Sequence, residues 1–313
     1  MKFILKRLAL LSIPVLAWLA FFIAFEPNNY FGLKESSNST APIGRIRAYE
    51  ADPGPRVILG DSRMAHFDLD LVEQVSGRPW QNLAFGGASL RETCDLLEYL
   101  LDNYPQLEEV VFGVSFYSLS AAYDVDRMST LQDVLDNPLA YCFNLEYNVN
   151  TLTNFTDWLA GRQGGEETGD WVYPDDYTDA QGNVYPLHLQ LALYPQSILP
   201  RCENFRINES QAQRLYELAL RCEEQGVELT VVLPPVADYI MDTVCIPLGI
   251  DQKMGEFLVT LEGWSEECGF TLLDYEWTNR PDFDDDTQFY DGLHLDTRYG
   301  LPQFTEMLFT QVG

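Results

Sequence analysis

Basic side chains are scarce in this sequence. Across 313 residues, 19 Lys and Arg stand against 48 Asp and Glu, so the formal net charge is −29. Non-specific nucleic-acid binding needs Lys and Arg to neutralise phosphates, so no nucleic acid is expected as a partner. The same shortage of basic residues argues against peripheral binding to anionic lipid. Hydrophobic residues make up 46% of the chain, which is enough for a sizeable core and excludes global disorder.

Histidine and cysteine are also few. The three histidines are His66, His188 and His294, and any mechanism with a histidine base must use one of them. Six cysteines are too few for a disulfide scaffold, and without a CxxC spacing they do not indicate zinc. Outside the cytosol some of them are candidates for disulfides, and the sequence does not fix which pair. They are Cys94, Cys142, Cys202, Cys222, Cys245 and Cys268.

One long uncharged run stands at the N-terminus. It extends over Leu8–Phe25 and follows the basic residues Lys2, Lys6 and Arg7. At about 1.5 Å per residue the run nearly spans a hydrocarbon core of about 30 Å. The basic cluster predicts that the N-terminus stays inside and the rest lies outside. A cleaved signal peptide is the rival interpretation, but Phe22–Phe25 is a poor small-residue cleavage site.

These features predict a simple domain organisation. Residues 1–7 form a cytoplasmic N-terminus, 8–25 a transmembrane signal anchor and 26–50 a tether, and 51–313 one extracytoplasmic domain on the cell membrane. No later stretch is long and apolar enough to span a bilayer. The tether includes the small and polar segment Lys34–Pro42.

Past residue 50, strand and helix patterns alternate. Buried strands are predicted at Arg56–Leu59, Trp80–Phe85, Glu109–Val114, Val227–Leu233 and Phe270–Leu273. Helices are predicted from Ser89 onward and at Glu209–Glu224, Lys253–Cys268 and Thr297–Phe309. This alternation indicates a parallel sheet covered on both faces, whose ligands bind at the carboxyl ends of the strands.

A long insertion, about residues 117–205, interrupts the alternation of strands and helices. It is rich in Trp and Tyr, and Trp171–Tyr173 and Asn183–Tyr185 are spaced to pair as a hairpin. The insertion is either a packed cap or an aromatic platform on which sugar rings stack.

Three strand ends carry residues suited to chemistry. Gly60-Asp61-Ser62 places a serine on a sharp turn, where a following helix N-terminus would favour developing negative charge. Gly86-Gly87 closes the second strand and is able to present a backbone N–H to an oxyanion. Asp291-Gly292-Leu293-His294 follows the fifth strand, with spacing that lets a carboxylate orient an imidazole. Each motif alone is weak.

Together, in this order and at successive strand ends, the motifs resemble the SGNH (GDSL-like) hydrolase superfamily. The resemblance implies a three-layer α/β/α sandwich with a five-stranded parallel sheet, a flavodoxin-like arrangement. It also implies that Ser62 is the nucleophile and that Asp291 and His294 complete the triad. The N–H groups of Ser62 and Gly87 would form the oxyanion hole. Ser115 occupies the position of the family's oxyanion-hole Asn, a departure that puts the third donor in doubt.

The anchor and the insertion resemble a membrane-anchored subgroup more closely. It includes the D-alanyl transfer protein of teichoic acid synthesis and the alginate O-acetylation proteins. The resemblance implies a serine esterase or O-acyltransferase acting on acylated cell-surface polysaccharide or a small ester, with a membrane-bound acyltransferase as a possible partner. No metal or organic cofactor is implied.

Several alternatives stay open from the sequence alone. His66 lies four residues after Ser62 and is a rival base, while His188 lies in the insertion and is either structural or in contact with substrate. The acidic run Asp282–Asp286 is a solvated loop or a calcium site, although it lacks the EF-hand spacing. A non-catalytic protein that binds glycan or assists envelope-polymer assembly is the competing class. A lipase fits less well because the insertion is polar and acidic.

Overall fold

The computed structural model describes residues 2–33, 42–135, 137–161 and 202–312, and between them residues 177–178, 184–185, 192, 195 and 198–199. The chain divides into two compact units, which are described separately. The first comprises Met1–Ala48 and Ser129–Thr168, and the second comprises Tyr49–Met128 and Gly169–Gly313.

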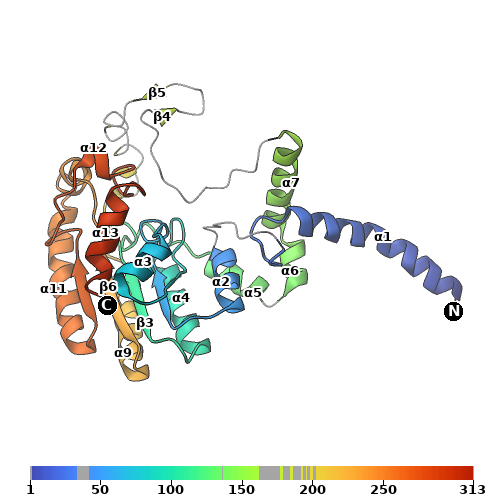
Figure 1. Cartoon of the computed structure of the whole chain (residues 1–313), viewed down its shortest axis with the longest axis horizontal. Coiled ribbons are helices and arrows are strands. Elements are labelled where there is room, and N and C mark those ends of the chain that lie inside the picture. The colour runs from blue at the N-terminus through green and yellow to red at the C-terminus, as the bar shows by residue number, and fades with distance from the viewer. Residues whose placement is uncertain are drawn as a thin grey trace. The chain divides into compact units, whose positions relative to one another are not determined.

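A five-stranded, all-parallel sheet forms the centre of the second unit, in which β3 and β6 are labelled in Figure 1. Its strand order is β2-β1-β3-β6-β7. The strands are β1 (Arg56–Leu59), β2 (Gln81–Asn82), β3 (Glu109–Gly113), β6 (Glu228–Leu233) and β7 (Thr271–Asp274). Strand β3 is buried along its whole length, as expected for a central strand covered on both faces. Four of the five strands lie within about one residue of the predicted bounds, and the predicted parallel sheet is confirmed.

The second strand is shorter than predicted. Its regular part is only Gln81–Asn82, because the Asn82 side chain accepts a hydrogen bond from the N–H of Ala84 (2.9 Å). Such local hydrogen bonds compete with the backbone hydrogen bonds that join neighbouring strands. The following loop still runs beside β1, since the N–H of Phe85 donates to the carbonyl of Gly60 (3.1 Å). The two loops that leave β1 and β2 therefore lie side by side.

Two groups of helices cover the sheet and complete the α/β/α sandwich. Helices α4, α9 and α11 pack side by side, and α3 packs against α13. Their bounds are α3 (Leu69–Ser76), α4 (Leu90–Asn103), α9 (Glu209–Gln225), α11 (Ile250–Cys268) and α13 (Gly300–Phe309). Shorter helical segments are α10 (Asp238–Ile240), η1 (Met241–Cys245) and α12 (Asp285–Gln288). Against prediction, α11 begins three residues earlier and α13 three residues later.

Helix α4 shows why these predictions hold. Ser89 and Glu92 form a capping box, in which each side chain accepts a hydrogen bond from the other's backbone N–H. The predicted apolar face of this helix, which includes Leu90, Cys94 and Leu97, is buried. A capping residue followed by apolar residues at helical spacing was the signal in the sequence.

The first unit is helical where it is described. It contains α1 (Lys2–Phe25), α6 (Pro138–Phe143), α7 (Leu145–Leu159) and most of α5 (Met128–Leu135) and α2 (Pro42–Ala51). The ring of Phe155 on α7 packs edge-on against Phe21 and Phe25 of α1, with centroids 5.1 Å away in both cases. No helix in the described part of the chain has the length and apolar character needed to cross a membrane.

The predicted tether, residues 26–50, is not loose throughout. Helix α2 begins within it, and Tyr30 stacks on Tyr141 with ring centroids 4.1 Å apart. The Tyr30 hydroxyl also donates to the carbonyls of Val134 (2.9 Å) and Leu135 (2.8 Å). Aromatic burial thus packs the start of the segment into the first unit, while residues 34–41 lie outside the described residues.

The insertion is divided between the two units. Residues Ser129–Thr168 belong to the unit that contains α1, and the insertion residues before Ser129 and from Gly169 belong to the unit that contains the sheet. A two-stranded antiparallel pair joins β4 (Tyr177–Thr178) to β5 (Val184–Tyr185). The second arm of the predicted hairpin is therefore present, but its partner is β4. The predicted first arm, Trp171–Tyr173, lies outside the described residues, so the aromatic platform stays a prediction.

All six cysteines are buried, and no disulfide is present among the described residues. Burial raises the pKa of the Cys94 and Cys222 thiols to about 12. Buried thiols of this kind are unreactive and pack as small apolar side chains.

Candidate active site

Ser62 lies in a tight turn directly after β1. Gly60, which directly follows the strand, has a φ of +142°, and a Cβ there would come within 2.8 Å of the Met64 Cγ. Only glycine tolerates both conditions. The N–H of Met64 donates to the carbonyl of Asp61 (3.0 Å), so the chain turns here without entering a helix. The expectation that Ser62 precedes a helix N-terminus is wrong, because α3 begins only at Leu69.

The serine meets an imidazole from the other end of the chain. The Ser62 Oγ lies 2.7 Å from the His294 Nε2, and the His294 Nδ1 lies 2.8 Å from the Asp291 Oδ2. The side chains of His294 and Asp291 are 13% and 14% exposed, so the imidazole and the carboxylate are mostly shielded from water. A serine, an imidazole and a carboxylate are thereby joined in one hydrogen-bonded chain.

The loop between β7 and α13 holds this geometry by itself. The Asp291 Oδ1 accepts hydrogen bonds from the backbone N–H groups of Leu293 and His294, both at 2.8 Å. The N–H of Tyr290 donates to the carbonyl of His294 (2.7 Å) and closes the turn. The same carboxylate therefore shapes the loop and contacts the imidazole, which is why a spacing of three residues suits this pair.

Two backbone donors beside the serine remain unused. Among the hydrogen bonds of the described residues, neither the N–H of Ser62 nor the N–H of Gly87 donates to a protein acceptor. Gly87 has a φ of +61°, a conformation that favours glycine. The bond from Phe85 to Gly60 holds its loop beside the Ser62 turn. Unpaired N–H groups at such a position are suited to bind a developing negative charge.

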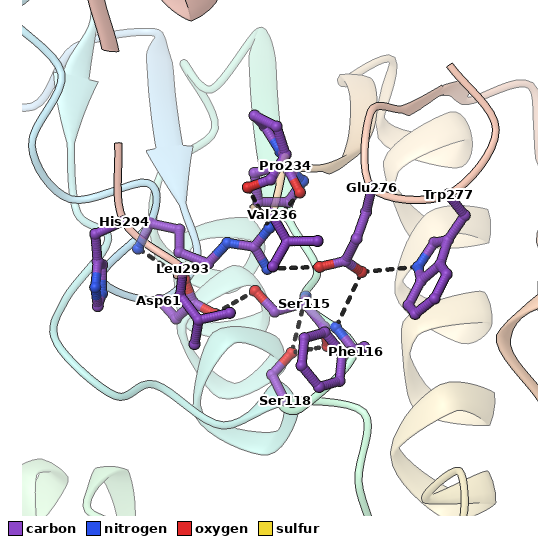
Figure 2. A network of polar contacts seen from close by, with 12 residues as sticks. Asp61, Ser115, Phe116, Ser118, Pro234, Val236, Glu276, Trp277, Leu293 and His294 are labelled. Carbon is purple, nitrogen blue, oxygen red and sulfur yellow. Dashed lines mark hydrogen bonds and ion pairs between the residues drawn. The ribbon is translucent and has the colours of Figure 1, made fainter. Parts of the chain in front are cut away.

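Ser115, the predicted third donor, is engaged elsewhere. It is 1% exposed, and its hydroxyl donates to the Asp61 Oδ2 at 2.5 Å. Its backbone N–H donates to the Ser118 Oγ at 3.1 Å (Figure 2). With both donors used inside the protein, Ser115 has none left for an oxyanion in this arrangement. The Ser115 hydroxyl is engaged because the Asp61 carboxylate, at the end of the neighbouring strand β1, lies within hydrogen-bond distance of it.

Asp61 stabilises the turn that contains Ser62. Besides the Ser115 hydroxyl, it accepts the N–H of Arg63 at 2.9 Å. Burial, and next the negative charge of Asp61, raise the pKa of the Tyr117 phenol well above its usual value, so this phenol stays protonated. Asp61 thus accepts hydrogen bonds from two neighbouring groups and has a structural role in the turn.

A buried ion pair that the sequence did not reveal lies beside this turn. The Arg63 Nη1 lies 2.6 Å from the Glu276 Oε1, with side chains only 2% and 0% exposed. The second Glu276 oxygen accepts the indole N–H of Trp277 (2.8 Å) and the backbone N–H of Phe116 (3.2 Å) (Figure 2). Burial alone would lower the pKa of Arg63, but the Glu276 charge raises it.

Arg63 also reaches β6. Its guanidinium donates to the carbonyls of Pro234 and Pro235, the residues directly after that strand. Arg63 follows Ser62 in the chain, so this network ties the serine turn to the ends of three neighbouring strands, β3, β6 and β7. Its adjacency to Ser62 was the only signal in the sequence that could have singled it out.

The other candidate residues of the sequence analysis have different positions. His66 shares no helix face with Ser62, because the intervening residues form turns, and His188 lies outside the described residues. In the acidic run, Asp284 caps α12, and Asp285 accepts the backbone N–H groups of Asp238 (2.9 Å) and Tyr239 (2.8 Å). Within the described part of the chain, no cluster of His, Cys, Asp and Glu is arranged to hold a metal ion.

Comparisons with known proteins add little. No protein-family model matches the sequence, and no curated protein matches it. Among solved structures, the chain is similar to an inhibitor-bound aryl esterase of M. smegmatis. The two share 12% sequence identity with a TM-score of 0.36, over 82% of this chain and 98% of the other. A similarity at this level carries no argument about activity.

Proposed function

We propose that the chain is a serine esterase or O-acyltransferase that acts on ester-linked acyl groups. The strongest support for this activity is the chain of hydrogen bonds that runs from Ser62 through His294 to Asp291. A serine hydroxyl is a weak nucleophile until an adjacent base accepts its proton. A carboxylate on the far side of the imidazole holds the tautomer that performs this task.

In the first half of the reaction, the Ser62 hydroxyl attacks the acyl carbonyl while its proton moves to the His294 Nε2. The tetrahedral oxyanion accepts hydrogen bonds from the N–H groups of Ser62 and Gly87. When the intermediate collapses, the bond to the donor oxygen breaks, and His294 returns the proton to the departing alcohol. The acyl group is left as an ester on Ser62.

In the second half, His294 removes a proton from the acceptor, which attacks the acyl-serine. Collapse of the second tetrahedral intermediate releases the acylated acceptor, and the proton returns to the Ser62 oxygen. Water as the acceptor gives an esterase, and a sugar hydroxyl gives a transferase. The protein's own groups supply every proton transfer in this scheme.

The proposed location is outside the cytosol at the cell membrane. It is supported by the basic residues before the uncharged run Leu8–Phe25. On α1, Leu11 and Leu16 are 73% and 60% exposed, although they are apolar. Exposed apolar side chains on one helix are suited to contact with protein or lipid. A site near the membrane suits acylated surface polysaccharide as substrate and a membrane-bound acyltransferase as donor.

A non-catalytic role is the second candidate. It is favoured by the engagement of Ser115 with Asp61, because the site then lacks a third oxyanion donor. Such a protein would bind glycan or assist polymer assembly and would need no proton transfer at Ser62.

Labelling with a fluorophosphonate separates the two candidates. The wild-type chain should form a covalent adduct, and Ser62→Ala should not. Ser210→Ala, an exposed serine at the start of α9, is the matched control and should label as the wild type does. Equal labelling of the wild type and Ser62→Ala would refute the assignment of the nucleophile.

The acceptor is tested in cells that carry the gene. The O-acyl content of purified envelope polysaccharide is compared between a deletion strain and one carrying Ser62→Ala. Loss of acyl groups in both indicates a transferase, and a rise in both indicates an esterase. Loss only in the deletion strain indicates the assembly role.

A further inference from the structure

We propose that Arg127 is a positioning residue that fixes the oxyanion-binding loop. The inference rests on the proposed function and extends it to a residue outside the three motifs. Arg127 Nη1 donates to the carbonyl of Gly86 (3.2 Å), and Nη2 donates to the carbonyl of Gly87 (2.9 Å). One guanidinium thus holds both carbonyls of the loop.

The guanidinium is itself held by a buried carboxylate. Arg127 Nε and Nη2 donate to the two oxygens of Glu92, both at 2.8 Å. The Glu92 side chain is 0% exposed, whereas that of Arg127 is 43% exposed. A planar, two-pronged pair of this kind fixes the direction of the guanidinium far better than a single contact does. Glu92 also caps α4, so the clamp is attached to the helix that follows the loop.

A second side chain from the same segment reaches the same carbonyl. The Tyr123 hydroxyl donates to the carbonyl of Gly87 at 2.8 Å. A Cβ at Gly87 would lie 2.9 Å from that hydroxyl, so the close approach depends on glycine. The Ser89 hydroxyl donates to the carbonyl of Val125 (2.6 Å) and ties the segment to α4. Three hydrogen bonds therefore reach the carbonyls of two glycines that would otherwise be free to turn.

The peptide geometry connects this clamp to catalysis. The carbonyl of Gly86 and the N–H of Gly87 belong to one planar trans peptide and point in opposite directions. Holding the carbonyl with a positive charge fixes the direction of the N–H and polarises it as a donor. An oxyanion donor is effective only when it is oriented before the charge develops. Arg127 therefore acts on the transition state through the loop without touching substrate.

The test uses the full chain and p-nitrophenyl acetate. Arg127→Ala should lower kcat about 10- to 100-fold with little change in KM, somewhat less than the loss of a whole oxyanion donor. Arg127→Lys should lower it similarly, because an ammonium group lacks the planar fork. Guanidinium or methylguanidinium added to Arg127→Ala should restore part of kcat and should not help Arg127→Lys.

Arg91→Ala is the matched control. Arg91 also links α4 to this segment, through an ion pair with Asp124, but it does not contact the glycine loop. This variant should keep the wild-type kcat. A boronic acid, whose tetrahedral adduct presents an oxygen to the oxyanion hole, should bind Arg127→Ala more weakly by the factor lost in kcat. If Arg127→Ala does not fold, Tyr123→Phe tests the same loop and should lower kcat by a smaller factor.

The outcomes separate this inference from the proposed function. If the wild type is labelled at Ser62 but kcat and boronate affinity are the same in Arg127→Ala and Arg91→Ala, the clamp has no positioning role. A rise in KM alone would also contradict it. If the wild type is neither labelled nor active, the proposed function fails, and the inference fails with it.

Discussion

The two ends of the parallel sheet both carry a glutamate held by arginine, yet only one end carries a candidate site. At the carboxyl end, Glu276 pairs with Arg63 at 2.6 Å, with side chains 0% and 2% exposed. At the amino end, Glu109 pairs with Arg56 (2.8 Å) and Arg78 (2.5 Å), and these arginines are 16% and 30% exposed. Similar ion pairs therefore stand in different surroundings.

The amino end also carries a cavity. A cavity of about 520 Å³ lies there, lined by Arg78 and Glu109, by residues at the ends of α9 and α11 and by Val312 near the C-terminus. None of the described residues that line it is a serine or a histidine. The carboxyl end instead has a glycine with a positive φ, two N–H groups that donate to no acceptor among the described residues, and the hydrogen-bonded chain from Ser62 to Asp291. The candidate site is identified by polar groups that point toward one another. Cavity volume or charge alone does not identify it.

The largest effect that would test this comparison comes from Asp291→Asn. The amide keeps the size of the side chain but no longer holds the imidazole in the required tautomer, so ester hydrolysis should fall by about 10³- to 10⁴-fold. Thermal unfolding of the variant should stay close to that of the wild type. His66→Ala is the control and should be mild. A larger loss with His66→Ala than with His294→Ala would move the base to His66.

Much of the carboxyl end could be predicted because its signals are local. Asp291 and His294 are three residues apart, and the turn that joins them is made by the same Asp. The strands were recognisable as short apolar runs, and α4 by its capping residue. Such features depend on neighbours in the chain and are therefore visible without the fold.

The parts that were missed depend on contacts between distant residues. Arg63 and Glu276 are 213 positions apart, and Arg127 and Glu92 are 35 apart. No periodicity or spacing rule connects such pairs. The engagement of Ser115 with Asp61 is of the same kind, since it brings together the ends of β1 and β3. The prediction of a helix directly after Ser62 was wrong for a local reason. Gly60 and Asp61 direct the chain into turns at this point.

An intermediate effect, on stability, is expected when the glutamate of each ion pair is replaced by glutamine. Glu276→Gln should lower the free energy of unfolding by about 3–5 kcal/mol, because it leaves the Arg63 charge buried without a partner. Glu109→Gln should lower it by about 1 kcal/mol, since Arg56 and Arg78 reach solvent. Urea denaturation of the full chain in detergent measures both values. Equal losses would show that burial does not distinguish the two ends.

The smallest effect is expected from Arg78→Ala at the amino end. Arg78 donates to Glu109 and to the carbonyl of Val312 (2.7 Å), and it lines the cavity. Glu109 keeps its bond to Arg56, so the free energy of unfolding should fall by only about 1 kcal/mol. The rate of fluorophosphonate labelling at Ser62 should not change, because no hydrogen bond of the serine turn involves this residue. A fall in labelling comparable to that of Asp291→Asn, in a variant that remains folded, would mean that the amino end controls the site. The two ends would then have to be treated as one functional system.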